Sequence, residues 1–473
     1  MSLFDKHQWH QWQEQAQTLV NRSLDRHLRL AVTGLSRSGK TAFITALVQQ
    51  LEQVGFSARL PHWQVVQSGR LLGAKRVPQL NHHIPTFPYE AGLDALYGTP
   101  PTWPAPTRAV SEIRLELRFN THHPLLRHLS REASSLFLDI VDYPGEWLLD
   151  LPLLQMSYPQ WSEQVRAQLE RPELRSAAAD WLQLGSTLSL SAPHDDEALR
   201  DLATRYTQWL HHCKSTLGLS LIQPGRFVLP AEHAGAPMLQ FVPWVWGPLP
   251  ASAAPGSLQA MLEERFAHYK HHLVQGFYRD HFASFDRQIV LVDCLQPLQS
   301  GESAMLDLEQ TLAQLIQSFN YGQSSWLRRL FAPRIDKLLF AASKADHVTP
   351  DQHGNLQSLL RDLVQRAYGV ARFEGIEIEC LPIASVRASE YRQVNHEGRL
   401  LNALQGTTLS GEPVHLFPGE VPNRRPGAHF WSARADSGFG FIALQPPLMR
   451  RGVAMPHLRL DQVLEFLLGD KLR

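Results

Sequence analysis

A phosphate-binding loop pattern near the N-terminus constrains the fold of this chain more than any other feature. An apolar run from Leu28 to Val32 leads into residues 34–41, which read GLSRSGKT and match the pattern G-x-x-x-x-G-K-[ST]. A helical pattern follows directly, so the motif has the strand–loop–helix context that it requires. The backbone N–H groups of such a loop point at phosphate oxygens, and the positive end of the following helix strengthens the field. The stretch therefore predicts a nucleotide-binding unit.

The side chains of this loop have separate expected roles. Lys40 is expected to reach the β- and γ-phosphates, and the Thr41 hydroxyl to take one position on Mg²⁺. Arg37, in the fourth position of the loop, either places a cation near the transferring phosphoryl group or lies in solvent. The expected nucleotide-binding residues of the loop are Gly34, Ser36, Arg37, Ser38, Gly39, Lys40, Thr41 and Ala42.

A second motif, D-x-x-G, follows an apolar strand pattern and runs from Asp142 to Gly145. A carboxylate at the end of a strand can hold Mg²⁺ through water, opposite Thr41, and the Gly145 backbone N–H can sense a γ-phosphate. Asp139, within the strand, is expected to be structural. The spacing after an apolar strand, in a chain with a phosphate-binding loop, favours a functional role for Asp142.

Residues 339–346 read LFAASKAD and predict how a purine base is selected. They resemble the [NT]-K-x-D motif of GTPases, with Ser in place of Asn or Thr. The carboxylate of Asp346 can accept hydrogen bonds from N1–H and N2–H₂ of guanine, whereas adenine offers no such pair, and the Lys344 stem can cover the base plane. A last strand runs into Ser385 and Val386, where GTPases place a loop whose backbone touches the guanine oxygen.

In this order the motifs resemble the GTPase branch of phosphate-loop NTPases. The whole chain resembles the YcjX-like family of bacterial stress-associated proteins, through the phrases WPAPTRAVSEIRLEL, LDIVDYPGEW and FAASKADHV. The resemblance implies a GTPase-type core with GTP/GDP and Mg²⁺ as ligands, a helical insertion, and a cytoplasmic protein linked to envelope stress. An ATPase remains an alternative, as does a nucleotide-gated scaffold whose helical insertion binds an envelope-stress protein.

The resemblance also implies roles around the transferring phosphate. Arg37 occupies the position where guanylate-binding proteins and atlastins carry an internal arginine finger, and Arg108 is a second candidate. Glu146 stands where small GTPases keep a Gln that orients water, and its charge near phosphate leads us to expect slow intrinsic hydrolysis. Thr107 lies where GTPases place the Mg²⁺-ligating switch Thr, with Thr99 and Thr102 as rivals. The expected metal ligands are Thr41, Thr107 and Asp142, and the catalytic candidates are Lys40, Arg37, Glu146 and Thr107.

The remaining sequence predicts an α/β fold of the P-loop NTPase class with insertions. Residues 111–119 alternate between polar and apolar side chains, and 136–141 follow after a connection that suits an antiparallel pair. Later strands alternate with helices, which indicates a mostly parallel sheet covered on both faces. Residues 54–110 are expected to form a long irregular segment with the mobile loop. The expected units are an N-terminal helix (1–27), a discontinuous core (28–146 and 286–393), a helical insertion (147–285) and a β-rich appendage with a C-terminal helix (394–473).

The composition limits which cellular compartment and which classes of binding partner we expect. The chain has 473 residues, with 45 Lys and Arg against 45 Asp and Glu, so its charge does not indicate a nucleic-acid partner. Its three cysteines are far apart and predict neither a disulfide framework nor a zinc site, which fits a reducing compartment. The N-terminal sequence lacks the regions of a signal peptide, and no apolar run approaches a membrane span. We expect a cytoplasmic location with at most peripheral membrane contact.

Overall fold

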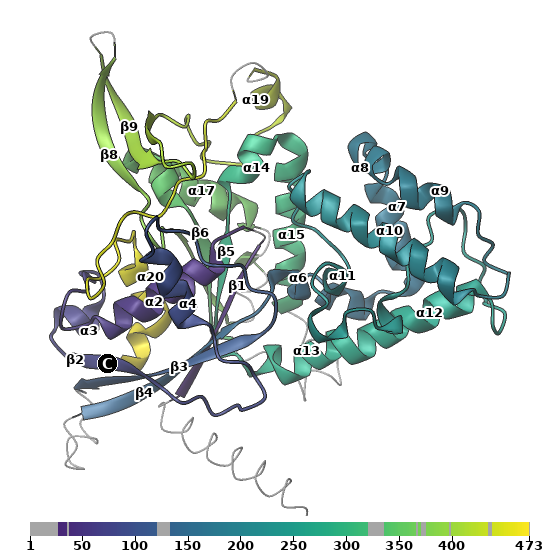
Figure 1. The fold of residues 1–473 in the computed structure, drawn as a ribbon, viewed down its shortest axis with the longest axis horizontal. Helices are drawn as coiled ribbons and strands as arrows, with labels where there is room; N and C mark the ends of the chain where they lie inside the picture. The colour runs from purple at the N-terminus through teal and green to yellow at the C-terminus, as the bar shows by residue number, and fades with distance from the viewer. Residues whose placement is uncertain are drawn as a thin grey trace, which may run out of the picture.

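The computed structural model centres on a seven-stranded sheet with helices on both faces (Figure 1). The predicted N-terminal helix lies outside the described residues, apart from residue 27, which begins the first strand. The structure describes residues 27–35, 37–120, 133–319, 335–365, 368–369, 375–396, 399–433 and 438–472.

The strand order of this sheet is β2-β3-β4-β1-β5-β6-β7. The strands β4, β1, β5, β6 and β7 are parallel to one another. Strand β3 is antiparallel to both of its neighbours, β2 and β4. The predicted α/β fold class, mostly parallel with one antiparallel strand, is therefore confirmed. The strands are β1 (His27–Gly34), β2 (Leu71–Val77), β3 (Ser111–Asn120), β4 (Ala133–Asp142), β5 (Arg287–Val292), β6 (Lys337–Ala342) and β7 (Glu377–Pro382).

Apolar side chains from both faces of the sheet form two cores. Leu28, Leu30 and Val32 of β1 are buried with α2, α4 and α20, whereas Ala31 belongs to the core on the opposite face with α14, α15 and α17. All six residues of β5 are buried, as expected for a central parallel strand. The helices are α2 (Lys40–Glu52), α3 (Gln64–Gln67), α4 (Tyr89–Leu96), α14 (Leu295–Ser300), α15 (Glu302–Phe319), α17 (His353–Leu363), α19 (Ala428–Ala433) and α20 (Leu460–Leu468).

Helices between β4 and β5 extend to one side of the sheet, at the right of Figure 1. Their interior is aromatic, with Trp161 stacked on Phe266 at a centroid distance of 5.1 Å and Trp181 edge-on to Tyr206 at 5.2 Å. The elements are α6 (Gly145–Leu148), η1 (Leu151–Gln155), α7 (Tyr158–Gln168), α8 (Pro172–Ala177), α9 (Ala179–Gly185), α10 (Asp196–Ser215), α11 (Gly225–Val228), η2 (Ala231–His233), η3 (Pro237–Leu239), α12 (Leu258–His268), η4 (Tyr269–Val274), α13 (Gln275–Asp280) and η5 (Phe282–Ser284).

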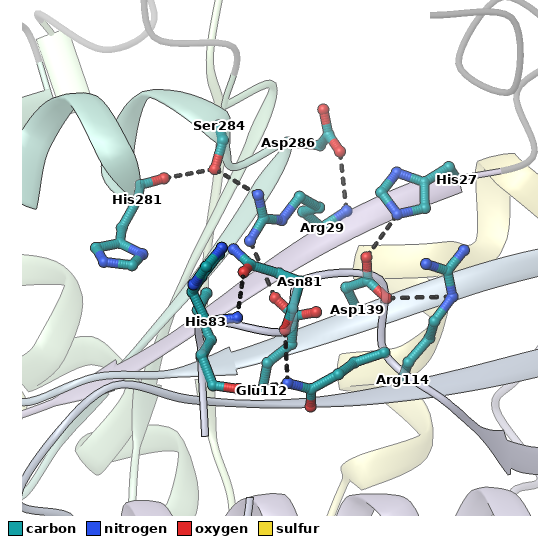
Figure 2. Close-up of polar contacts among 12 residues, drawn as sticks. His27, Arg29, Asn81, His83, Glu112, Arg114, Asp139, His281, Ser284 and Asp286 are labelled. Carbon is teal, nitrogen blue, oxygen red and sulfur yellow. Dashed lines mark hydrogen bonds and ion pairs between the residues drawn. The ribbon is translucent and has the colours of Figure 1, made fainter. Parts of the chain in front are cut away.

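A polar network joins the end of this helical segment to the sheet (Figure 2). Arg29 of β1 donates through Nη1 to Ser284 Oγ at 2.9 Å and through Nη2 to Glu112 Oε2 at 3.1 Å. Asp139 of β4 lies with its Oδ2 atom 2.6 Å from His27 Nε2. Arg29 therefore joins β3, on the far side of β4, to Ser284 at the end of the helical segment, so this segment and the sheet share a polar contact as well as an apolar core.

Residues 54–110 are more ordered than we expected from their sequence. The prediction of a long irregular segment is wrong for Leu71–Val77, which forms the edge strand β2 and pairs antiparallel with β3. Gly73 interrupts this strand, where the pairing register shifts between Leu71 and Gly73. An edge strand with exposed side chains on both faces lacks the clean alternation by which strands are recognised. The short helices α3 and α4 also lie within this segment.

The predicted β-rich C-terminal part is present as a small antiparallel sheet. Its strands are β8 (Ser389–His396), β9 (Arg399–Thr407) and β10 (Pro413–Leu416), and the β8–β9 hairpin projects from the body of the molecule (Figure 1). The helix α20 and the short 3₁₀ helix η9 (Gly469–Leu472) return to the sheet, where Leu464 and Leu468 are buried. Within the residues described above, no helix is both long and apolar enough to cross a membrane.

Candidate functional site

A cavity of about 450 Å³ lies at the edge of the sheet where the parallel strands end. The register pairs Val32 of β1 with Asp142 of β4, and Ala342 of β6 with Pro382 of β7, so the loops after these strands meet at one edge. The cavity is lined by Gly34, Leu35, Arg37, Ser38, Gly39, Lys40, Thr41, Ala42, Trp103, Pro104, Pro106, Thr107, Arg108, Pro144, Gly145, Glu146, Lys214, Leu229, Ser343, Lys344, Asp346, His347, Ala384, Ser385, Val386, Leu409, Ala443 and Leu444.

The predicted phosphate-binding loop makes a tight turn into α2. Gly39 has a φ of 81° immediately before α2, a conformation that glycine adopts without steric cost. The Ser38 side chain is buried, and its hydroxyl oxygen has no hydrogen-bond partner in the described part of the chain. Ser36, which the motif also assigns to the nucleotide, lies outside the described residues. The loop thus offers backbone donors at the N-terminus of a 13-residue helix.

Three side-chain oxygens predicted as metal ligands lie together beside this loop. Thr41 Oγ1 is 3.2 Å from Thr107 Oγ1, and the Thr107 hydroxyl donates to Asp142 Oδ2. Lys40 Nζ lies 2.8 Å from Asp142 Oδ1 and donates to the carbonyl of Tyr143 at 2.5 Å. An all-oxygen group of one carboxylate and two hydroxyls has the chemistry that Mg²⁺ prefers. The residues present therefore fit this ion.

The two rival threonines are placed differently. Thr102 donates its backbone N–H to the Ala95 carbonyl at 2.8 Å, and neither Thr99 nor Thr102 lines the cavity. Arg108 lines the cavity beside Thr107 and is exposed. The structure thus brings Thr107, rather than its rivals, to Thr41 and Asp142.

The D-x-x-G segment is in direct contact with helices from the segment between β4 and β5. Glu146 Oε1 lies 2.5 Å from Lys214 Nζ of α10. A Cβ atom on Gly225 of α11 would lie 2.1 Å from the Glu146 carbonyl oxygen, so α11 packs directly on this backbone. Trp147 Nε1 donates to the Leu229 carbonyl at 3.1 Å. The segment that follows Asp142 is therefore held by two elements of the helical segment.

Asp150 completes this contact from inside the protein. Its Oδ1 atom accepts from the Gly225 N–H at 2.8 Å, and its Oδ2 atom accepts from the Tyr269 hydroxyl at 2.5 Å. Burial raises the pKa of Asp150 to about 7, although these hydrogen bonds oppose the shift. A buried carboxyl with backbone partners therefore fixes α11 to the end of the D-x-x-G segment.

Arg37 is exposed, lines the cavity and contacts the end of α10. Its Nη2 atom donates to the Ser215 carbonyl at the end of α10, at 3.2 Å. Its φ of 63° is uncommon for a residue with a side chain. Arg37 therefore connects the phosphate-binding loop to the same helix end that carries Lys214.

The predicted base-reading residues line the same cavity. Asp346 is buried, and its Oδ2 atom accepts from the Ala388 N–H at 2.7 Å. Lys344 Nζ lies 2.6 Å from Asp293 Oδ2, which fixes the lysine stem beside the cavity. Ser385 and Val386 follow β7 and line the cavity as well. The candidate phosphate and base ends are therefore parts of one site.

The C-terminal part also reaches this cavity. Trp103 Nε1 in the Pro-rich loop donates to the Leu444 carbonyl at 2.7 Å, and Gln445 Nε2 donates to the Pro101 carbonyl at 3.0 Å. Sequence reasoning missed Trp103, Leu444, Asp293 and Lys214. Their positions depend on tertiary contacts between segments far apart in the chain, and none of them belongs to a local motif.

Comparison with known proteins identifies relatives over nearly the whole chain. The family described as "YcjX-like family, DUF463" matches residues 28–472. A protein of Escherichia coli (strain K12) named "Ras-like GTPase YcjX" is 54% identical over 463 residues, which cover 96% of this chain and 98% of the relative. A protein of the same name from Shewanella oneidensis (strain MR-1) is 43% identical over 481 residues, covering 98% of each chain. The chain therefore belongs to the YcjX-like family.

Proposed function

We propose that this protein is a Mg²⁺-dependent GTPase that uses GTP hydrolysis as a switch. The observation that carries the proposal is the single cavity lined by the phosphate-binding loop, Gly145 of the D-x-x-G motif and Asp346 of the base-reading motif. The names of both relatives support guanine nucleotide as the ligand. A cavity of about 450 Å³ lies within the usual size range of small-molecule sites.

The phosphate end of the site is proposed to work through charge and position. Lys40 and the N–H groups before α2 bind the β- and γ-phosphates, and Lys40 exchanges its contact with Asp142 for phosphate oxygens. Thr41, Thr107 and Asp142 would hold Mg²⁺, which neutralises charge on the phosphates when bound. The Gly145 N–H donates to the γ-phosphate, so the presence of this phosphate changes the position of α6 and of the helical segment packed against it.

The base end is proposed to select guanine. The carboxylate of Asp346 accepts the hydrogen bonds of N1–H and N2–H₂, and its bond from the Ala388 N–H holds it in place. Lys344 covers the base while Asp293 holds its ammonium group. The division into a discontinuous core, a helical insertion and a C-terminal part belongs to the same proposal. A cytoplasmic location and a role in stress stay predictions from the family resemblance.

Direct titration tests this function. Labelled GTP and ATP are titrated against the purified full chain in Mg²⁺ and in EDTA, and single-turnover hydrolysis is followed in the same samples. We expect tight GTP binding, weak ATP binding and hydrolysis only in Mg²⁺. A preference for ATP would overturn the guanine assignment. GTP binding without hydrolysis, in Mg²⁺ and with a protein partner or lipid added, would favour a nucleotide-gated scaffold.

A further inference from the structure

Lys214 brings a positive charge from the helical segment into the cavity that the phosphate-binding loop lines. It lies in the last turn of α10, and its Nζ atom is 2.5 Å from Glu146 Oε1. The two side chains are 20% and 11% exposed, so this ion pair is screened by solvent far less than a surface pair. The pair spans the junction between α10 and the D-x-x-G segment.

The end of α10 requires positive charge if it is to lie beside a triphosphate. The C-terminus of a helix carries partial negative charge on its free carbonyl groups. Arg37 donates to one of these groups, the Ser215 carbonyl, and so offsets the charge of the helix end. Both cations line the cavity, but the Arg37 guanidinium donates to the backbone of α10, whereas the Lys214 ammonium group donates to the Glu146 side chain.

The Lys214 ammonium group also keeps donors for an anion. An ammonium group has three N–H donors, and in the described part of the chain Lys214 has one hydrogen-bond partner, Glu146. Lys40, in the loop itself, is proposed to bind the β- and γ-phosphates in exchange for its contact with Asp142. Lys214 is thus a cavity-lining cation in addition to Arg37, Lys40, Arg108 and Lys344. It is held in place by a carboxylate and is supplied by the helical segment between β4 and β5.

Resting on the proposed GTPase function, we propose that Lys214 is a catalytic residue that donates to an oxygen of the transferring γ-phosphoryl group. In hydrolysis, the oxygen of water forms a bond to the γ-phosphorus while the bond from that phosphorus to the β–γ bridging oxygen breaks. The electron pair of the broken bond stays on GDP, and the protons of the water pass to phosphate and solvent. Lys214 stays protonated and stabilises the charge that spreads over the phosphoryl oxygens.

Glu146 is a positioning residue in this arrangement. Its carboxylate holds the Lys214 ammonium group, so the pair is neutral overall and places an ammonium group, rather than an unpaired carboxylate, beside the γ-phosphate. This accounts for a Glu where small GTPases keep a water-orienting Gln. It also makes hydrolysis depend on the seating of α10 against the core, since the cation belongs to that helix.

Binding of GDP with aluminium fluoride, which mimics the transferring phosphoryl group, tests the proposal without requiring turnover. The variants are Lys214→Met, Lys214→Arg and, as a matched control, Lys270→Met, whose ammonium group donates to the Met156 carbonyl and lies outside the cavity lining. We expect Lys214→Met to lose fluoroaluminate binding and to hydrolyse GTP at least about 10²-fold more slowly. GDP affinity should change by less than about threefold, because GDP lacks the group that Lys214 contacts. Lys214→Arg should restore fluoroaluminate binding, and Lys270→Met should behave as wild type.

The possible outcomes separate this inference from the function on which it rests. Fluoroaluminate binding by Lys214→Met equal to that of wild type, with GTP still bound and hydrolysed, overturns the role of Lys214 and leaves the GTPase proposal standing. If Lys214→Met lowers GDP affinity and the melting temperature along with fluoroaluminate binding, Lys214 acts only by holding α10 against the core. This outcome likewise overturns the catalytic role. Failure of the wild-type chain to bind GTP at all overturns the proposed function itself.

Discussion

The backbone of Gly145 lies directly against Gly34, so that a Cβ atom on Gly145 would lie 2.2 Å from the Gly34 carbonyl oxygen. The two glycines belong to different motifs: Gly34 is the last residue of β1, and Gly145 follows its parallel neighbour β4. A side chain at Gly145 would have to push the D-x-x-G segment away from the phosphate-binding loop. The contact therefore sets the distance between the proposed phosphate-binding loop and the segment that is proposed to sense the γ-phosphate.

Replacement of Gly145 by Ala should damage both stability and hydrolysis. The obstacle is backbone rather than a flexible side chain, so we expect a loss of about 1–3 kcal/mol in the free energy of unfolding. Single-turnover hydrolysis should fall by about 10²-fold, because displacement of reacting groups by about 1 Å has effects of this size. Urea denaturation and quenched-flow measurements on the same variant check the two expectations.

Gly354 provides the control for this substitution. It lies in α17, is exposed, and has no atom within 4 Å of the position that a Cβ would occupy. Gly354→Ala should be neutral or stabilising by up to about 1 kcal/mol, because alanine favours helix more than glycine does. If both variants hydrolyse GTP at the wild-type rate, the contact between Gly145 and Gly34 does not position the site.

Asp346→Asn should change which nucleotide binds. The amide can keep the bond from the Ala388 N–H but presents an N–H₂ group in place of one acceptor oxygen. GTP affinity should fall on the order of 10²-fold, the size expected for loss of a charge-assisted hydrogen bond, and affinity for xanthosine triphosphate should rise. Competition with a labelled nucleotide measures both effects.

Asp351 supplies a matched carboxylate for this measurement. It lies in η8 (Pro350–Gln352), is exposed and does not line the cavity. Asp351→Asn should leave both affinities within about twofold of wild type, as expected for surface substitutions. Equal GTP affinities in Asp346→Asn and wild type would show that Asp346 does not contact the base.

The contrast between Asp346 and Lys214 shows what could be predicted from this sequence. Asp346, Lys40 and Asp142 belong to motifs with fixed spacing, and each lies at or shortly after the end of a strand that the sequence predicts. Their meeting at one sheet edge therefore follows from parallel topology. Lys214 lies at the site because of the direction in which the 20-residue helix α10 runs, and no local sequence pattern specifies that direction. Strand β2 was not predicted for a related reason. Gly73 and two partly exposed faces remove the alternation of polar and apolar side chains by which a strand is recognised.

Asp150→Ala should destabilise the contact between α11 and the D-x-x-G segment. It would leave the Gly225 N–H and the Tyr269 hydroxyl buried without their partner. We expect a loss of about 2–4 kcal/mol in the free energy of unfolding. Asp201→Ala in α10 removes a carboxylate that is 50% exposed and paired with Arg205, and should cost no more than about 0.5 kcal/mol. Equal urea midpoints for the two variants would contradict the structural role of Asp150.

His281 should make stability depend on pH below neutrality. Burial lowers the pKa of His281 to about 4, with the nearby charges of Arg29 and Arg226 acting in the same direction and those of Asp280 and Glu232 opposing them. The unfolded chain takes up the proton near pH 6.5, whereas the folded chain does so near pH 4. The stability that neutral His281 contributes is therefore present above pH 6.5 and is lost as the pH falls towards 4. At pH 5 the loss amounts to about 2 kcal/mol in the free energy of unfolding.

Urea denaturation at pH 7.5 and pH 5.0 checks this expectation. His281→Gln removes the titrating group. Between the two pH values, its free energy of unfolding should fall by about 2 kcal/mol less than that of wild type. His271→Gln, at an exposed position in η4, should keep the wild-type pH dependence. A wild-type slope in His281→Gln would assign the pH dependence to other groups.

Thr107→Val should raise the Mg²⁺ requirement of hydrolysis. The substitution keeps the shape of the side chain but removes the hydroxyl that lies 3.2 Å from Thr41 Oγ1 and donates to Asp142. Loss of one oxygen contact of about 1.4 kcal/mol corresponds to an approximately tenfold higher Mg²⁺ concentration at half-maximal rate. Thr102→Val is the control, since Thr102 lies in the same Pro-rich loop and its backbone bond to Ala95 does not need the hydroxyl. If Thr102→Val instead shifts the Mg²⁺ midpoint and Thr107→Val does not, the loop binds the ion through Thr102 in a conformation other than the one described, and the oxygen group around Asp142 is not the metal site.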